Sequence, residues 1–223
     1  IRVRDTRVGL GQLAAHWRNR FAIPVIGVTG SNGKTTVKEM VAAILRQAAA
    51  TGKAEANAQT DYILATEGNL NNDIGVPQML LRLRRQHRYA VIEMGMNHVG
   101  EIAYLSRLVK PSIALITNAG AAHIEGLGSV EAVARAKAEI FAGLDQQGMA
   151  VINADDTYAP LWRECAGARK IVDFGLREKA QVSAEYHVDL LVNRIRLKLP
   201  DGIIELKLQA PGVHNVYNAM AAA

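Results

Sequence analysis

The chain has 223 residues, of which 49% are hydrophobic and 21% charged, and its formal net charge at pH 7 is +5. This composition predicts an ordered globular protein and excludes a disordered chain. No apolar run reaches the ~20 residues that a membrane span needs, and the first residues lack the apolar core of a signal peptide. The single cysteine, Cys165, cannot form an internal disulfide. We therefore expect a cytoplasmic protein without a membrane span.

The basic residues are scattered along the chain. Their densest cluster, RLRRQHR at 82–88, has no aromatic residues between its charges, so we expect no nucleic-acid partner. The cluster indicates either a solvated face or a surface that attracts a polyanionic small substrate.

Apolar runs of strand length alternate with segments of helical spacing. The runs are IPVIGVT (23–29), YAVIEMG (89–95), SIALITN (112–118), MAVINAD (149–155) and KIVDFG (170–175). Each run is continuous, which is typical of strands buried on both faces of a parallel sheet. After the first run, an apolar stripe at helical spacing predicts a helix, and its members are Val37, Met40, Val41, Ile44 and Leu45. This βαβ pattern predicts an α/β fold with a P-loop-type, mostly parallel sheet flanked by helices.

Two segments depart from this pattern. The stretch 48–61 is polar and alanine-rich, and we expect it to be an exposed excursion without evident chemistry. After about residue 175, IRLKLPDGIIELKL alternates apolar and charged residues on both sides of Pro200-Asp201-Gly202. That alternation predicts an antiparallel hairpin and hence a small antiparallel sheet within 176–210.

The stretch GVTGSNGKTT (27–36) has the character of a phosphate-binding loop. It follows a predicted buried strand and opens a predicted helix, whose unpaired N–H groups suit phosphate oxygens. Lys34 would reach the β- and γ-phosphates, and Thr35 would offer its hydroxyl to Mg²⁺. Val28 stands where such a loop usually has its first glycine, so a chance glycine-rich turn is the alternative. The expected nucleotide-binding residues of the loop are Thr29, Gly30, Ser31, Asn32, Gly33, Lys34, Thr35 and Thr36.

Polar side chains follow two other predicted strands. Glu93 ends one of them, and Asn118 and His123 follow the next. Ligands of open parallel sheets collect at the carboxyl ends of strands, so we expect these residues to lie near the phosphate loop. Glu93 is a candidate Mg²⁺ ligand, with an ordinary strand-end hydrogen bond as the alternative. For His123, a nucleotide-site role and a solvated loop position both remain open.

A lysine lies on the apolar face of the helix predicted to begin near Ser129. Lys137 falls in the middle of that face, whose apolar members are Val130, Val133, Ile140, Phe141 and Leu144. A partly desolvated lysine has a lowered pKa, and its neutral amine can react with CO₂ to give a carbamate that binds metal. The alternative is a packed stem whose ammonium group reaches water.

Five motifs resemble, in order and spacing, the Mur ligases of bacterial cell-wall synthesis. They are GVTGSNGKTT, GNLNNDIGVP (68–77), VIEMGMNHVGEI (91–102), AAHIEGLGSVEAVARAKAEIF (121–141) and PGVHNVYNAMAA (211–222). The phosphate loop is shared with the wider superfamily, including folylpolyglutamate synthases. The second and fourth motifs are most similar to the branch that joins D-alanyl-D-alanine to UDP-N-acetylmuramoyl-tripeptide. In Mur ligases the loop commonly has the sequence G-x-T-G-x-N-G-K-T, and its first glycine corresponds to Gly27.

The resemblance implies an ATP-dependent, amide-forming ligase of peptidoglycan biosynthesis that acts through an acyl phosphate. It implies two Mg²⁺ ions, the first held by Thr35 and Glu93 and the second by Glu93, His123 and a carbamylated Lys137. The catalytic residues would be Lys34, Glu93, His123 and Lys137. Asn69, Asn71 and Asn72 would lie near the γ-phosphate and the peptide carboxylate, with turn chemistry as the alternative. Asn118 would contact the nucleotide. His214, Asn215 and Asn218 match the family motif that lies beside adenine; without the resemblance, they would indicate only the start of a helix.

The resemblance also implies a domain organisation. Residues 23–223 would be the central ATP-binding domain, and residues 1–22 would be a connection and helix leading from an amino-terminal domain that binds the UDP substrate. Because the chain starts at Ile1 and stops within NAMAAA, we expect a fragment of a longer protein. We expect the protein to be a monomer and the fragment to be inactive alone. The alternatives are another ligase of the superfamily and a non-catalytic nucleotide-binding module that switches a partner.

Overall fold

The computed structural model describes residues 2–51, 61–121 and 124–223. Its centre is a six-stranded sheet in the order β2-β3-β1-β4-β5-β6, and every neighbouring pair is parallel. The strands are β1 (Val25–Thr29), β2 (Ile63–Ala65), β3 (Tyr89–Glu93), β4 (Ile113–Ile116), β5 (Met149–Asn153) and β6 (Lys170–Phe174). All five residues of β1 are buried, as expected for a strand in the middle of a sheet that is covered on both faces.

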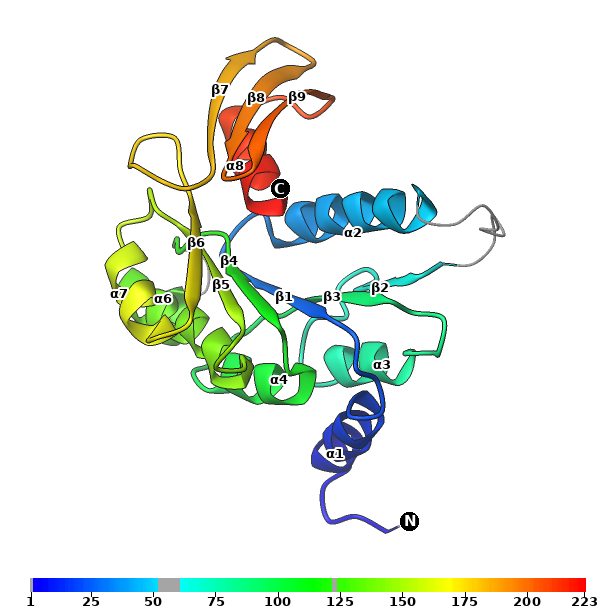
Figure 1. The fold of residues 1–223 in the computed structure, drawn as a ribbon. Coiled ribbons are helices and arrows are strands. Elements are labelled where there is room, and N and C mark those ends of the chain that lie inside the picture. The colour runs from blue at the N-terminus through cyan, green and yellow to red at the C-terminus, as the bar shows by residue number, and fades with distance from the viewer. Residues whose placement is uncertain (1, 52–60, 122–123) are drawn as a thin grey trace.

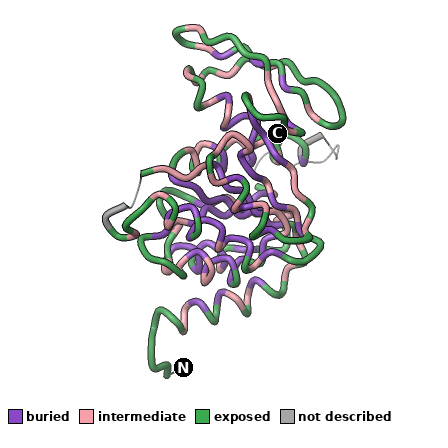
Figure 2. Tube along the Cα trace, turned by 90° about the vertical axis from the view of Figure 1, so that its left-hand side faces the viewer, coloured by how far each residue is buried: buried purple, intermediate pink, exposed green. Residues whose placement is uncertain are grey.

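Helices cover both faces of this sheet (Figure 1). One face carries α2 (Lys34–Thr51) and α8 (Val213–Ala222). The opposite face carries a larger apolar cluster, built with the helices α1 (Thr6–Arg18), α3 (Gly75–Leu81), α4 (Glu101–Val109), α6 (Val130–Ala138) and α7 (Ala159–Ala166). A short helix α5 (Ile124–Leu127) precedes α6, and the 3-10 helix η1 (Glu139–Gly143) follows it. Buried residues concentrate in the strands between these two layers (Figure 2).

A three-stranded antiparallel sheet lies beyond α8. It has the order β7-β8-β9, and its strands are β7 (Ser183–Val188), β8 (Asn193–Leu199) and β9 (Gly202–Leu208). In β8, Ile195 and Leu197 are buried and join the same apolar cluster as α2 and α8. The small sheet therefore belongs to the face of the molecule that carries the start of α2.

The structure confirms the predicted parallel strands and the hairpin at 200–202. It also adds two strands that were not predicted, β2 and β7. β2 has three residues, too few for an apolar run to stand out, and β7 is mostly exposed, with no buried face to create a pattern. Among the described residues, no helix is long and apolar enough to cross a bilayer.

Two details of the predicted helices are wrong, and one predicted segment overlaps a helix. Ile44 was placed on the buried stripe of α2 but is 49% exposed, because the packed face of the helix is formed by Val37, Val41 and Ala42. The predicted excursion at 48–61 begins as helix, since α2 continues to Thr51; residues 52–60 lie outside the described part. The helix after Ser129 ends at 138 and tightens into η1 before Leu144.

Candidate nucleotide site

The phosphate loop joins β1 to α2, and its two glycines occupy conformations that other residues rarely adopt. Gly33 has φ +80°, and a Cβ atom there would lie 2.4 Å from Oδ1 of Asn218. Gly30 has φ +150°, and a Cβ atom there would lie 1.9 Å from Oγ1 of Thr117. Both positions therefore require glycine, because a side chain would collide with the elements that surround the loop.

The loop is held by the segment that follows β4. The N–H of Asn32 donates to Oδ1 of Asn118 over 3.0 Å, and Nδ2 of Asn118 donates to the Asn32 carbonyl over 3.0 Å. The hydroxyl of Thr117 donates to the same carbonyl over 2.6 Å, and the N–H of Ser31 donates to the Asn118 carbonyl. Asn118, predicted to contact nucleotide, thus uses its amide to shape the loop.

Lys34, the first residue of α2, folds back over the loop. Its Nζ donates to the carbonyl of Gly30 over 2.8 Å. Burial lowers the pKa of Lys34, and the negative charge of Glu93 opposes that shift. The ammonium group of Lys34 therefore lies against the loop backbone and within the electrostatic influence of Glu93, where it can donate to phosphate oxygens.

Glu93 is almost fully buried, at 2% exposure, at the carboxyl end of β3. Its Oε2 accepts a hydrogen bond from the hydroxyl of Thr35 over 2.8 Å, and its Oε1 accepts one from Nδ2 of Asn71 over 2.8 Å. A carboxylate beside a hydroxyl at a helix N-terminus offers the hard oxygen ligands that Mg²⁺ prefers. The donor set of Thr35 and Glu93 therefore fits a magnesium ion.

The three asparagines predicted near the substrate occupy different environments. Asn71 contacts Glu93, as described above. Asn72 accepts the N–H groups of Ile74 and Gly75 on its Oδ1, at 3.2 and 2.8 Å, so its side chain organises the turn into α3. Asn69 is exposed. Thr29 also has a structural bond, because its buried hydroxyl donates to the carbonyl of Met94 over 2.9 Å.

Lys137 is completely buried in α6, with 0% exposure. Its Nζ has no hydrogen-bond partner among the described residues. The ammonium group does not reach water, so the alternative of a packed stem with a solvated head is wrong. Burial, followed by the positive charge of Lys34, lowers the pKa of Lys137 to about 7. The repulsion also indicates that Lys137 lies close to the phosphate loop.

His123, the remaining predicted metal ligand, lies outside the described residues. Within the part of the chain that the structure describes, no group of three or more His, Cys, Asp or Glu side chains forms a metal cluster.

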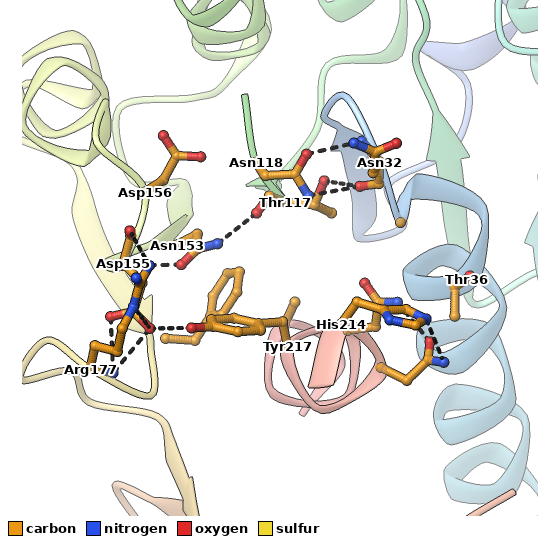
Figure 3. A pocket seen from close by; sticks show the side chains of 15 residues that line it. Asn32, Thr36, Thr117, Asn118, Asn153, Asp155, Asp156, Arg177, His214 and Tyr217 are labelled. Atoms are coloured by element: carbon orange, nitrogen blue, oxygen red, sulfur yellow. Dashed lines mark hydrogen bonds and ion pairs between the residues drawn. The ribbon is translucent and has the colours of Figure 1, made fainter. Parts of the chain in front are cut away.

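A cavity of about 760 Å³ extends from the loop toward α8, and its lining residues come from five segments, 32–36, 117–118, 153–156, 174–177 and 214–221. Figure 3 shows their side chains around the cavity. The predicted residues Asn32, Gly33, Thr36, Asn118, His214, Asn215 and Asn218 line it. Nδ2 of Asn218 donates to Oδ1 of Asn215 over 3.0 Å. The side-chain oxygen of Asn218, Oδ1, lies beside Gly33. The cavity thus joins the phosphate loop to the motif predicted for adenine.

Sequence reasoning missed half of this lining. The additional residues are Thr117, Asn153, Asp155, Asp156, Phe174, Arg177, Tyr217 and Ala221. A signal was present for several of them, since NADD (153–156) begins with the last residue of β5, just as Glu93 ends β3. The rule that ligands collect at strand carboxyl ends applies equally to both positions.

The family comparison agrees with this geometry. The Mur ligase middle domain matches residues 28–223, which include the phosphate loop, β3, α6 and α8. The chain belongs to the Mur ligase family. The family resemblance predicted from the five motifs is thereby confirmed, and Val28 is compatible with membership.

Relatives of this Mur ligase domain carry a common name. The chain is 45% identical to a UDP-N-acetylmuramoyl-tripeptide--D-alanyl-D-alanine ligase of Escherichia coli strain K12, over 99% of this chain and 47% of that protein. It is 37% identical to the protein of that name from Bacillus subtilis strain 168, over 100% of this chain and 45% of that protein. The chain therefore spans about half the length of these curated relatives.

Solved structures support the same fold. MurF from Acinetobacter baumannii superposes with a TM-score of 0.89 at 43% identity, covering 99% of this chain and 46% of that one. MurF ligase from Thermotoga maritima, solved in complex with ADP, gives 0.83 at 25% identity, covering 100% of this chain and 49% of that one. A folylpolyglutamate synthase mutant of L. casei, at 16% identity and a TM-score of 0.68, shares the fold alone.

Proposed function

We propose that this chain is the ATP-binding part of a ligase that joins D-alanyl-D-alanine to UDP-N-acetylmuramoyl-tripeptide in peptidoglycan biosynthesis. The observation that carries the proposal is the convergence of Lys34, Thr35 and Glu93 at the start of α2, beside the nucleotide cavity. The names of the relatives supply the substrates, and the ADP complex of the Thermotoga maritima ligase supports a nucleotide in this position.

The reaction brings two anions together. The terminal carboxylate of the tripeptide attacks the γ-phosphate in line, which forms an acyl phosphate and releases ADP. The amine of D-alanyl-D-alanine then attacks the acyl carbon, the amide bond forms and inorganic phosphate leaves. Catalysis of the first step depends on positioning and charge neutralisation more than on acid or base groups.

The loop residues divide this work. The N–H groups at the start of α2, exposed by Gly30 and Gly33, would bind the β-phosphate. Lys34 would leave the Gly30 carbonyl and donate to the β- and γ-phosphates, which lowers the repulsion that the attacking carboxylate meets. Thr35 and Glu93 would hold Mg²⁺, which supplies charge neutralisation on the phosphate oxygens when bound. Asn71 would keep the Glu93 carboxylate in a fixed orientation.

Lys137 would take a different role. A buried amine without a hydrogen-bond partner beside a second lysine is unfavourable for folding. Reaction of the neutral amine with CO₂ forms an N–C bond and releases a proton, and the resulting carbamate would be attracted to Lys34 and would supply oxygen ligands. We propose that this carbamate, Glu93 and His123 hold a second Mg²⁺.

The Lys137→Ala variant tests this role. It should lose ligase activity, and added short carboxylates such as acetate or propionate should restore part of it by filling the vacated space. A variant that no carboxylate rescues, together with an electron-density map in which Lys137 of the unaltered protein carries no added group, would remove the carbamate from the proposal.

The remaining parts of the proposed enzyme lie outside the chain. We propose that residues 23–223 form the central domain, with residues 1–22 as the connection to a domain that holds the UDP sugar, and that another domain closes over ATP. His214, Asn215 and Asn218 would contact adenine. Both ATP and UDP-linked precursors are cytoplasmic metabolites, so the enzyme would act in the cytoplasm, and we expect a monomer.

A coupled phosphate-release assay tests the proposed function. The complete protein is incubated with ATP, Mg²⁺, UDP-N-acetylmuramoyl-tripeptide and D-alanyl-D-alanine, and we expect phosphate release that requires both acceptors. Parallel reactions with UDP-muramoyl dipeptide or folate acceptors identify another ligase of the superfamily if they are faster. Nucleotide-dependent binding to a partner without acceptor-stimulated phosphate release would instead favour a non-catalytic module.

A further inference from the structure

The far wall of the nucleotide cavity is assembled around one buried carboxylate, that of Asp155. Its side chain is 1% exposed and follows β5. It accepts the hydroxyl of Tyr217 over 2.6 Å and the N–H groups of Leu176 and Glu178 over 2.7 Å each. The N–H of Arg177 donates to both of its oxygens, at 3.1 and 3.0 Å. We call this group the Asp155 anchor.

The anchor joins three parts of the chain that are distant in sequence. Asp155 follows β5 by two residues, residues 176–178 lead from β6 toward the small antiparallel sheet, and Tyr217 belongs to α8. Figure 3 shows the Tyr217 hydroxyl directed across the cavity at Asp155, with Arg177 beside it. A buried carboxylate that accepts this many donors is well compensated for its lost hydration.

The ionisation of the pair is consistent with a fixed geometry. Burial alone would raise the pKa of Asp155, but hydrogen bonds from Tyr217 and from the backbone of 176–178 outweigh it and lower the pKa. Burial and the bond to Asp155 raise the pKa of Tyr217 to about 12. At neutral pH the carboxylate is therefore charged and the phenol holds its proton, so the donor and acceptor roles do not change.

The position of Tyr217 determines where its neighbours lie. Asn218 is the next residue of α8, and its Oδ1 faces Gly33 of the phosphate loop. His214, one turn earlier, lines the same cavity. α8 also packs against α2, β5, β6, β7 and β8, and the hydrogen bond from Tyr217 to Asp155 is a polar contact that fixes the side of the helix facing the cavity.

We propose that Asp155 is a positioning residue for the nucleoside half of ATP: it fixes Tyr217 and the 176–178 backbone, and through them the wall that receives base and ribose. This inference rests on the proposed nucleotide site. The site has a phosphate half and a nucleoside half. Thr117 and Asn118 hold the phosphate loop through direct hydrogen bonds, whereas the Asp155 anchor holds the nucleoside wall.

The decisive experiment compares two probes by isothermal titration calorimetry on the complete protein: a non-hydrolysable ATP analogue with Mg²⁺, and inorganic tripolyphosphate. In Asp155→Asn, the NH₂ group of the new side chain must face at least one of the hydrogen-bond donors that now point at the carboxylate, and the wall of the cavity shifts. We therefore expect the dissociation constant of the ATP analogue to rise about tenfold. The dissociation constant of tripolyphosphate should stay within about twofold of the unaltered protein's.

Two further variants keep the test interpretable. Tyr217→Phe removes a single hydrogen bond without adding polar atoms, and should raise the dissociation constant of the ATP analogue about three- to fivefold even if Asp155→Asn folds poorly. Asp173→Asn is the matched control. Asp173 is a buried acid on β6 that also accepts a backbone N–H, from Gln181, and a side-chain donor, from Arg163, and it does not line the cavity. The Asp173→Asn variant should bind both probes with the dissociation constants of the unaltered protein.

The outcomes separate the two proposals. Equal loss of both probes in Asp155→Asn and Tyr217→Phe, or the same loss in Asp173→Asn, means that the anchor serves stability alone and overturns the inference. Unchanged binding of the ATP analogue in folded Asp155→Asn and Tyr217→Phe overturns it as well. If the unaltered protein binds neither probe, the proposed nucleotide site itself fails, and the inference with it.

Discussion

Replacing Lys137 by methionine should stabilise the protein at neutral pH. The side chain is fully buried without a hydrogen-bond partner among the described residues, and burial lowers its pKa from 10.5 to about 7. In the unfolded chain the pKa returns to its ordinary value. Between these two values the unfolded state binds more protons than the folded state, so the unfolding free energy rises with pH, by up to about 1.4 kcal/mol per pH unit.

The size of the effect follows from that interval. About 3.5 pH units separate the two pKa values, so the burial of Lys137 costs at most about 5 kcal/mol at or below pH 7. At pH 9 only about 1.5 units remain, or roughly 2 kcal/mol. Methionine has a similar length and no charge and fills irregular apolar space well. We expect Lys137→Met to be more stable by about 2–5 kcal/mol at pH 7, and by no more than about 2 kcal/mol at pH 9.

Urea unfolding followed by circular dichroism at pH 7, 8 and 9 measures this difference. The buffers contain no CO₂, Mg²⁺ or nucleotide, because a carbamate would change the charge of Lys137. Lys170→Met, on the exposed first residue of β6, is the control and should leave the pH dependence of stability unaltered. If Lys137→Met and the unaltered protein have equal stability at pH 7, or a difference that is constant with pH, the argument from desolvation is refuted.

Three further substitutions test the phosphate loop. Lys34→Ala and Glu93→Gln should each lower the kcat of the complete enzyme at least about 100-fold, with thermal midpoints within a few degrees of the unaltered protein's; a variant that no longer folds would contradict the catalytic role. Gly33→Ala should lose about 1–3 kcal/mol of stability and weaken nucleotide binding, since its Cβ would lie 2.4 Å from Asn218. Gly167→Ala, with φ +63° and nothing within 4 Å, is the matched control, and an equal loss of stability in both would show that the contact with Asn218 is unimportant.

The sequence allows the parallel sheet and the phosphate loop to be predicted because both leave local patterns. Continuous apolar runs identify five strands, and the glycines and Lys34 mark the loop between a strand and a helix. Lys137 is also visible, since helical spacing places it among apolar residues. In contrast, β2 has only three residues, and its place at the sheet edge depends on pairing with β3, which no local pattern encodes.

The far half of the cavity could be predicted only in part. The position of NADD (153–156) at a strand end is a local signal, but the bond between Tyr217 and Asp155 joins residues 62 positions apart, and no local pattern indicates that pairing. Asn118 shows a second limit. Its location beside the loop follows from strand order, but whether its amide meets nucleotide or backbone depends on distances that only the folded chain supplies. The sequence therefore predicts where polar side chains gather, but the hydrogen-bond partner of each side chain is set by the packing of the folded chain.

A crystal structure of the protein with a non-hydrolysable ATP analogue and Mn²⁺, located by its anomalous signal, tests the central claim most directly. We predict the β-phosphate against the N–H groups of Gly33 and Lys34, a manganese ion bound by Thr35 and Glu93, and the base between α8 and the anchor. Analogue density elsewhere on the molecule, or metal that avoids Glu93, would contradict the assignment of this site.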